Sequence, residues 1–470
     1  MKKHRILATA TLAIFPAVVL QAQDNLIIHD RCQEADSTEL LISAKGLSLK
    51  ECMETALTNS EKLKIQSADI DDARVARRDA ILQAFTPSIS ADTYAYSNFG
   101  RSVDPQTNTY VSTTSFNNGY DVSGRINIFN GFEAVNNIKI SKTALKMGLD
   151  REQQMKDEIC LATMEAFCNV VYYKQLAQII DGQVTTLQNA LRLARKQEEL
   201  GQKGYADVIQ TEADLADMQY ELVTAQNNYN DAVTTLKDIM FWEPGKELAI
   251  DEESIINTGL LVPETIPDEI TSDAVENNPS VLVARGKILN AKLDLRTAKW
   301  KFSPYITLNG GWSTSFFTYP GQTGYTPVPF GQQFRNNSGE YIQITLSFPI
   351  FNRLATFSNL RKKQNALKKA TAEYNTTVRE VQSEIERAIQ DRNGATAAFS
   401  QAEHRTIVQE KAWEMNRKKF EQGLISPIDF RKAADNRLNA QAEQLNAMLK
   451  LQLKNSVVKY YNGISYIDQF

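Results

Sequence analysis

The chain has 470 residues, of which 42% are apolar, with 13 prolines and 21 glycines, and this composition excludes collagen-like and low-complexity classes. Charged residues make up 23% and the formal net charge is −4, which argues against a disordered chain and against a strongly basic nucleic-acid-binding protein. Four cysteines are too few to form a disulfide framework for a chain of this length.

The first 22 residues have the pattern of a secretory signal peptide. Two lysines and one arginine precede an apolar run over residues 6–20, and a cleavage site follows near Ala22. The run would span about 22 Å as a helix, which is short of a hydrocarbon core of about 30 Å. We therefore expect an exported protein, with residues 23–47 as an extended N-terminal segment.

The cysteines do not predict a functional site. Cys32 does not follow a small-residue lipobox, so the sequence does not predict a lipid-anchored N-terminus. Cys160 and Cys168 are eight residues apart in a helical pattern, about 12 Å along the axis, and we expect them to be buried. Whether Cys32 and Cys52 form a disulfide is left open by the sequence.

Short sequences in the first half of the chain recur in the second half at a constant offset of 222 residues. The recurring features are Phe129-Asn130 with Phe351-Asn352, Gly201 with Gly423, and Asp207 with Asp429. The chain therefore contains two repeats, predicted at residues 48–243 and 271–461, with a linker at 244–270 and a tail at 462–470.

Each repeat is predicted to contain a helix, a pair of strands, a long helix and a return helix. The predicted ranges are strands 88–98 and 120–130 with helices 131–200 and 205–242 in the first repeat, and strands 304–314 and 340–350 with helices 353–422 and 427–460 in the second. The strands alternate apolar and polar residues over about ten positions, which fits both a half-buried strand and a strand of a membrane barrel. Periodicity alone leaves both interpretations open.

The long helices carry an apolar seam with a seven-residue repeat. In the first of them Ile159, Ala166, Tyr173, Ile180 and Leu187 follow one another at this spacing, as in an antiparallel coiled coil. Seventy residues at 1.5 Å each would form a rod of about 105 Å, which is much longer than a globular helix. A plain coiled-coil scaffold would explain these rods, but it would not explain why a two-stranded amphipathic hairpin interrupts each repeat.

Aromatic residues gather near the strand ends, beside long polar loops at 99–119 and 314–339. We expect the following of them to form a membrane-interface belt: Tyr94, Tyr96, Trp312, Phe316 and Tyr341. Ordinary packing of loop aromatics is the alternative for each one.

Four strands cannot close a small barrel, and an open sheet edge cannot lie in lipid because its unpaired N–H and C=O groups cost several kcal/mol each. If the strands span a membrane, several chains must share one barrel. Two chains would supply eight strands and three would supply twelve, and periodicity does not choose between them.

The turn Gly-x-x-x-x-x-Asp-hydrophobic occurs at Gly201 to Val208 and again at Gly423 to Phe430. With the strand-to-helix junctions at 129–131 and 349–352, the signal and the duplicated units, the chain resembles the TolC family of outer-membrane efflux proteins over nearly its whole mature length. The resemblance implies a mainly α fold with a membrane β-barrel portion. It implies a homotrimer with a twelve-stranded barrel and an α-helical tunnel through the periplasm.

The same resemblance implies a passive duct in the outer-membrane lipid. Its partners would be a periplasmic adaptor and an inner-membrane pump or ABC exporter. The sequence carries no G-x-S-x-G, P-loop or H-E-x-x-H motif, and its histidines, His4, His29 and His404, are scattered. We therefore expect no enzyme activity, no metal and no cofactor.

Two acidic residues, Asp207 and Asp429, are predicted in the first turns of the return helices. Ser426 as N-cap and Pro427 in the first turn give Asp429 a capping role as one interpretation. The resemblance implies a second role, in which Asp429 forms an acidic ring at a constriction, attracting cations and hindering anions. Both roles are compatible.

The chain departs from the family pattern at two positions beside this predicted ring. Lys432 stands where the best-known member has a second acid, and Ile425 stands where it has an arginine clamp. The sequence therefore indicates a ring of mixed charge and a different latch.

The exposed turns are the predicted adaptor contacts, with simple turn formation as the alternative. Their residues are Gly201, Gly204, Tyr205, Gly423, Ser426 and Pro427. A periplasmic adaptor or scaffold without channel activity remains the alternative function. An adaptor would carry one helical hairpin flanked by β-rich halves, whereas this chain has two hairpins, each preceded by paired strands.

Overall fold

In a computed structural model of the chain, the residues described are 46–103, 108–112, 114–256, 267–320, 322 and 325–470. The predicted signal peptide at 1–22, residues 23–45 and Cys32 lie outside them.

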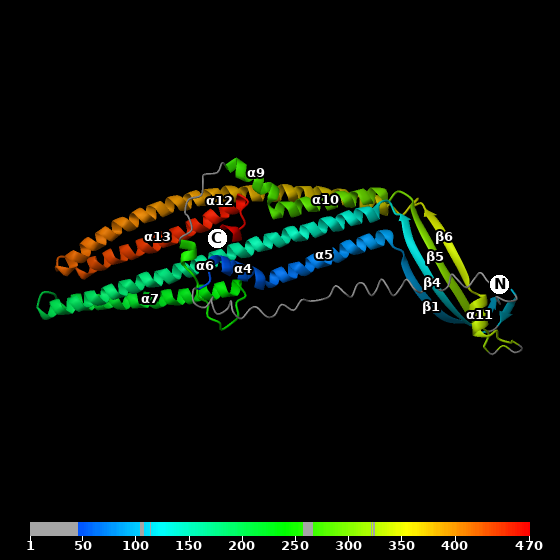
Figure 1. The fold of residues 1–470 in the computed structure, drawn as a ribbon, viewed down its shortest axis with the longest axis horizontal. Helices are drawn as coiled ribbons and strands as arrows, with labels where there is room; N and C mark the ends of the chain where they lie inside the picture. The colour runs from blue at the N-terminus through cyan, green and yellow to red at the C-terminus, as the bar shows by residue number, and fades with distance from the viewer. Residues whose placement is uncertain (1–45, 104–107, 113, 257–266, 321, 323–324) are drawn as a thin grey trace.

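The chain is mainly helical, with one four-stranded sheet at one end of its long axis and two helical hairpins at the other (Figure 1). The helices are α4 (Leu49–Asn59), α5 (Glu61–Phe85), α6 (Glu133–Glu199), α7 (Tyr205–Ile239), α8 (Glu253–Ile256), α9 (Pro267–Asn277), α10 (Pro279–Trp300), α11 (Phe330–Asn336), α12 (Ala355–Glu421) and α13 (Pro427–Tyr461), followed by a 3₁₀ turn (Ile467–Gln469). The strands are β1 (Ser88–Asn98), β2 (Arg101–Val103), β3 (Tyr110–Ser112), β4 (Ser115–Phe129), β5 (Tyr305–Thr318) and β6 (Gly339–Ser347).

The two long helices, α6 and α12, have 67 residues each and are therefore about 100 Å long. The recurring asparagine of each half, Asn130 or Asn352, bonds to the first turn of the long helix that follows it. Asn130 Oδ1 accepts a hydrogen bond from the Ala134 N–H at 3.4 Å, and Asn352 Oδ1 accepts from the Thr356 N–H at 3.3 Å. The recurring Phe-Asn sequence thus marks the change from strand to helix in each repeat.

Both long helices also end in the same way. Gly201 and Gly423 have φ values of +70° and +73°, a left-handed conformation that glycine adopts without strain. The N–H groups of Gln202 and Leu424 then bond back to carbonyl oxygens five residues earlier, at 2.8 and 2.9 Å. These Schellman-type ends close each helix and turn the chain into α7 and α13.

The sequence predicts one helix of about 38 residues from Ser48, but the structure divides it into α4 and α5. The Ser60 hydroxyl accepts a hydrogen bond from the Leu63 N–H at 3.4 Å, so Ser60 ends one helix and caps the next. The second repeat has the same break, where Asn278 caps α10 and separates it from α9. The helix prediction missed this because a serine or asparagine inside an apolar pattern does not always interrupt a helix.

The strand order in the main sheet is β1-β4-β5-β6, and all neighbours are antiparallel. β4 begins five residues before its predicted start, and β5 continues four residues beyond its predicted end, because the two strands pair with each other as far as Phe116 and Thr318. The predicted loops therefore contain more structure than expected, namely part of β4, the small β2–β3 hairpin and α11.

The core lies between the helices. Toward the sheet α6 packs between α5 and α10, and toward its far end it packs against α7 and α13. One apolar cluster around Met164 and Phe167 joins α4, α6, α7 and the end of α13. A second cluster, which includes Val184, Phe420 and Phe430, joins the two hairpins. The helices therefore form one continuous body beneath the sheet.

Candidate functional site

The main sheet has one polar and one apolar face, because its alternating strands pair in matching register. On the polar face the Arg125 Nε donates to Asn309 Oδ1 at 2.8 Å, and Thr307 Oγ1 bonds Asn127 at 3.3 Å. The opposite face is apolar and carries Ile89, Val122, Ile126, Leu308, Trp312, Ile342, Ile344 and Leu346.

The apolar face is open on the outer strand of the sheet. Ile342, Ile344 and Leu346 expose 85%, 67% and 54% of their surfaces, so this face is not a packed core in the single chain. Among the described residues β1 pairs only with β4 and β6 only with β5, so each has a free edge. A sheet with an uncovered apolar face and two free edges is an incomplete structure in water.

The register divides the five predicted interface aromatics between the two faces. Trp312 and Phe316 lie on the apolar face, whereas Tyr94, Tyr96 and Tyr341 lie on the polar face. The Tyr94 ring lies directly over Gly119, its partner on β4, because a Cβ added to Gly119 would be 2.3 Å from the ring. Tyr94 therefore points to the same face as Gly119. The register thus places Trp312 and Phe316 on one face of the sheet and the three tyrosines on the other, and the membrane-interface belt stays a prediction for all five.

Trp312 and Phe316 are also covered in part by α11. Phe334 lies 5.6 Å from Trp312, and Phe330 lies 5.4 Å from Phe316, between ring centroids. The buried Gln333 accepts from the Phe317 N–H at 3.1 Å and donates to the Phe317 carbonyl at 2.9 Å. Because β6 does not extend to this part of β5, α11 satisfies the strand edge that β6 leaves free.

The helix tips lie at the opposite end of the rods from the sheet (Figure 1). The predicted turn residues Gly201, Gly204, Tyr205, Gly423 and Ser426 are exposed, and Pro427 is buried. Tyr205 exposes 68% of its surface. These turns are available to a partner, except at Pro427.

The predicted capping role of Asp429 corresponds to hydrogen bonds in the structure. The Asp429 N–H donates to the Ser426 hydroxyl at 3.1 Å, and that hydroxyl donates to the Asp429 carboxylate at 2.8 Å. Asp429 and Lys432 are exposed, and Asp207 is half-buried in the first turn of α7. The Ser426 hydroxyl thus caps α13, and the Asp429 carboxylate supports this cap while it still faces solvent.

A cluster of charged residues that the sequence pattern did not reveal joins the two hairpins. Arg431 on α13 donates to Asp214 at 2.5 Å and to Asp217 at 3.0 Å, both on α7. Arg431 also lies 3.6 Å from Asp435 on its own helix. The hydrogen bond to Asp214 raises the pKa of Arg431 further above its usual range, so the guanidinium stays charged. We call these four residues the inter-hairpin latch.

A second contact joins the tips. The Lys203 ammonium, in the first turn, lies 4.0 Å from the centre of the Phe420 ring on α12. Burial lowers the pKa of Lys203, against the effect of Asp207, and Phe420 stacks on Phe430 at 4.2 Å. Ile425, at the position where the TolC resemblance implies an arginine, packs against this apolar cluster.

The model of the outer membrane efflux protein family matches residues 52–240 and 270–459. The chain belongs to this family. The two matched segments correspond to the two repeats of the fold, and members of this family are channels of the outer membrane. No curated protein sequence matches the chain.

Several solved structures share the fold. The chain superposes on the outer membrane protein VceC of Vibrio cholerae with a TM-score of 0.73 at 15% identity, covering 88% of this chain and 96% of VceC. It superposes on the CmeC outer membrane channel of Campylobacter jejuni with a TM-score of 0.70 at 16% identity, covering 90% of this chain and 85% of CmeC. It superposes on the open state of the MtrE outer membrane channel of Neisseria gonorrhoeae with a TM-score of 0.71 at 13% identity, covering 88% of this chain and 89% of MtrE.

The described part of the chain offers neither a membrane-spanning helix nor a cluster of metal ligands. No helix there is both long and apolar enough to cross a membrane. Within the same residues no group of three or more His, Cys, Asp and Glu side chains is placed to hold a metal ion. Cys52, Cys160 and Cys168 are buried thiols, and burial raises the pKa of each to about 12. Such thiols are unreactive at neutral pH.

Proposed function

We propose that the chain is the outer-membrane channel of a tripartite efflux or type I secretion system and acts as a passive homotrimeric duct. The observation that carries the proposal is the sheet with its polar face, an apolar face that is uncovered on β6, and two free edges. Three chains joined through β1 and β6 would supply twelve strands, which removes every edge and places the apolar face against lipid. The polar face would then line the lumen.

The helices would continue this lumen into the periplasm. α6 and α12 are about 100 Å long, with the tips at the end away from the sheet. The turns at Gly201 to Tyr205 and Gly423 to Ser426 would contact a periplasmic adaptor, which links the duct to an inner-membrane pump or ABC exporter. Asp429 and Lys432 would form a ring of mixed charge at the constriction.

The inter-hairpin latch would hold the constriction closed. Arg431 links α13 to Asp214 and Asp217 of α7, so it resists separation of the hairpins. Asp214 exposes only 2% of its side chain, and a buried charge is stable only while it keeps a partner. Arg431 would thus replace the clamp that Ile425 cannot supply.

The proposal is tested by reconstitution of the purified chain. We expect a heat-modifiable trimer band in outer-membrane fractions and discrete conductance steps in planar bilayers. A periplasmic adaptor or scaffold would give neither result. A water-soluble monomer that does not change bilayer conductance would contradict the proposal.

A further inference from the structure

A cavity of about 680 Å³ lies between α6 and α10, close to the sheet. Its charged lining residues are Lys139, Lys142 and Lys146 on α6, Arg285 and Lys292 on α10, and a single acid, Asp150. We call this cavity the basic groove. Five cations against one acid is a marked local excess in a chain whose formal net charge is −4.

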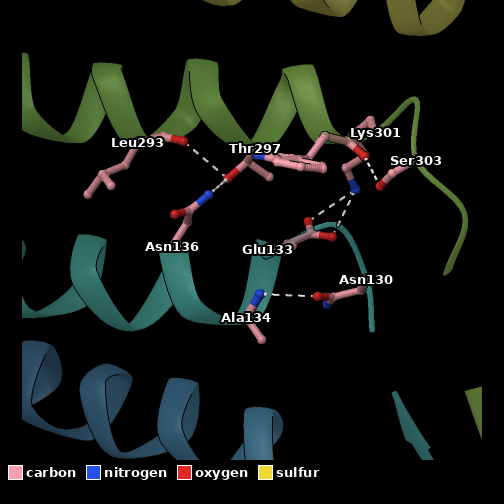
Figure 2. Close-up of polar contacts among 9 residues, drawn as sticks. Asn130, Glu133, Ala134, Asn136, Leu293, Thr297, Lys301 and Ser303 are labelled. Atoms are coloured by element: carbon pink, nitrogen blue, oxygen red, sulfur yellow. Dashed lines mark hydrogen bonds and ion pairs between the residues drawn. The ribbon is translucent and has the colours of Figure 1, made fainter. Parts of the chain in front are cut away.

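The floor of the basic groove is apolar. Met147, Leu289 and Leu293 line it. The two helices touch at both ends of the groove. Asn136 Nδ2 donates to Thr297 Oγ1 at 2.8 Å (Figure 2), and a Cβ added to Gly286 would meet the Met147 side chain at 2.5 Å. The groove is therefore built by the helix packing.

The strand-to-helix junction shows which side of the wall the groove occupies. Phe129 pairs with Ile306 on the apolar face of the sheet, and its ring lies 5.3 Å from Phe132, which lies 4.9 Å from Trp300. Leu293, which lines the groove, is seven residues, or nearly two turns, before Trp300 and thus lies on the same side of α10. The groove is a continuation of the apolar side of the sheet.

The polar side of the junction carries an ion pair, beside a cavity that Trp300 also borders. The Lys301 Nζ bonds the Glu133 carboxylate at 2.9 Å (Figure 2), and Asn127 and Tyr305 line the same cavity as this ion pair. Glu133 and Lys139 are separated by about a third of a turn on α6. The lumen side and the groove side of the helices are therefore distinct at this level.

The groove is at the depth of lipid headgroups if the apolar face lies in the membrane. Lys139 is about 10 Å below Phe132 along α6, and Lys292 is about 12 Å below Trp300 along α10. The headgroup layer is about 5–7 Å thick on each side of the hydrocarbon core, and lysine side chains reach about 6 Å beyond their backbone. Side chains on α6 also tilt toward its N-terminus, which is toward the sheet.

We propose that the basic groove binds the headgroup of an anionic phospholipid from the rod-side leaflet of the membrane. Lys139, Lys142 and Lys292 hold the phosphate, and the first acyl carbons lie on Leu293 and the Phe132–Trp300 ring pair. Lipid held in this way would fix the height of the tunnel relative to the membrane. The inference rests on the proposed function, because only a membrane-inserted sheet brings lipid to this position.

The test compares lipid retention by the full-length trimer after reconstitution with phosphatidylethanolamine and phosphatidylglycerol and extraction into detergent. The variant K139Q/K142Q/K292Q removes three cations of the groove. The control K411Q/K418Q/K419Q removes three exposed lysines of α12 near the tips, with the same change in charge. We expect native mass spectrometry to show phosphatidylglycerol enriched about fivefold over phosphatidylethanolamine on the wild type and control, and not on the groove variant.

Equal enrichment of phosphatidylglycerol on the groove variant and on the wild type would overturn the inference. Loss of the bound lipid on addition of millimolar inorganic phosphate would also overturn it, because the groove would then be a site for small anions. Conductance of the wild type in planar bilayers, measured in parallel, tests the proposed function separately. A conducting wild type that retains no phosphatidylglycerol contradicts the groove assignment alone. A wild type that neither inserts nor conducts contradicts both. A trimer band for each variant shows that the substitutions leave assembly intact.

Discussion

Arg431 on α13 donates a 2.5 Å hydrogen bond to Asp214 on α7, and this bond crosses the boundary between the two helical hairpins. Asp214 is almost fully buried, with Gln210 as its other hydrogen-bond partner at 2.9 Å. A pair of this kind is costly to break from one side only, because the remaining charge stays buried. The contact between the two hairpins at this level therefore depends on a few atoms.

The variant R431Q is expected to open the channel. Loss of the guanidinium leaves Asp214 with Gln210 alone, at a cost of about 3 kcal/mol to the closed state, which corresponds to roughly a hundredfold shift toward the open state. Single-channel recording in planar bilayers measures this as higher conductance or open probability.

Two controls separate the latch from a general loss of stability. The double variant D214N/R431Q has neither buried charge, so we expect it to be as stable as the wild type and still leaky. The variant R437Q breaks a 2.6 Å pair with Glu410 inside one hairpin, and we expect it to stay closed. Closed channels in R431Q and in the double variant would show that the pair has no gating role.

Asp429 is expected to act in two separable ways. The variant D429N keeps an acceptor for the Ser426 hydroxyl but removes the charge, so cation selectivity should fall while thermal stability is retained. The variant S426A removes the cap, at a cost of about 1 kcal/mol, and should leave selectivity unchanged. Reversal potentials under a salt gradient report selectivity. Unchanged selectivity in D429N would remove Asp429 from the constriction.

Much of the helical architecture could be predicted from the sequence, because long proline-free stretches with a seven-residue apolar repeat permit few other structures. The predicted seam positions Ile180 and Leu187 are buried in α6. The recurring Gly201 and Gly423 were also informative, since a left-handed helix end strongly favours glycine. The breaks at Ser60 and Asn278 were missed, because they depend on side-chain caps rather than on periodicity.

The functional contacts between elements could not be predicted in the same way. Arg431 and Asp214 are 217 residues apart, and nothing in their local sequence distinguishes them from the other charged residues of these helices. The side on which Tyr94 and Tyr341 lie depends on strand register, which the loops obscure. An aromatic near a strand end indicates an interface only once its face is known.

Gln333 is expected to hold α11 against the sheet. The variant Q333M has nearly the same size but loses the hydrogen bonds to Phe317 and the one to the Val328 carbonyl at 2.9 Å, leaving polar backbone atoms buried. We expect a cost of about 2 kcal/mol and cleavage between residues 319 and 338 that is about tenfold faster under limited proteolysis. Q332M, at the exposed neighbouring position, is the matched control. Equal cleavage rates in the two variants would contradict this role.

Asp157 is expected to make stability depend on pH. Burial raises the pKa of Asp157, against the hydrogen bond that Tyr460 donates to it at 2.9 Å. The folded state therefore binds the proton more tightly than the unfolded state, so this contribution is complete below the ordinary value of about 4 and is lost as pH rises through the raised pKa.

Thermal unfolding of the reconstituted wild type and D157N between pH 4 and 7 tests this sign. The free energy of unfolding should depend less steeply on pH in D157N, by at most about 1.4 kcal/mol per pH unit, because asparagine does not titrate. The asparagine oxygen can still accept the hydrogen bond from Tyr460. The exposed D231N should keep the wild-type slope. A D157N curve parallel to the wild type would exclude Asp157 as the titrating group.

The central claim is that the apolar face of the sheet contacts lipid while the polar face lines water. Spin labels placed singly at residues 342, 343, 344, 345 and 346 of β6 test it in the reconstituted trimer. Our account predicts that 342, 344 and 346 are accessible to lipid-soluble oxygen, and that 343 and 345 are accessible to a water-soluble nickel complex. Equal access of the nickel complex to all five positions would contradict it.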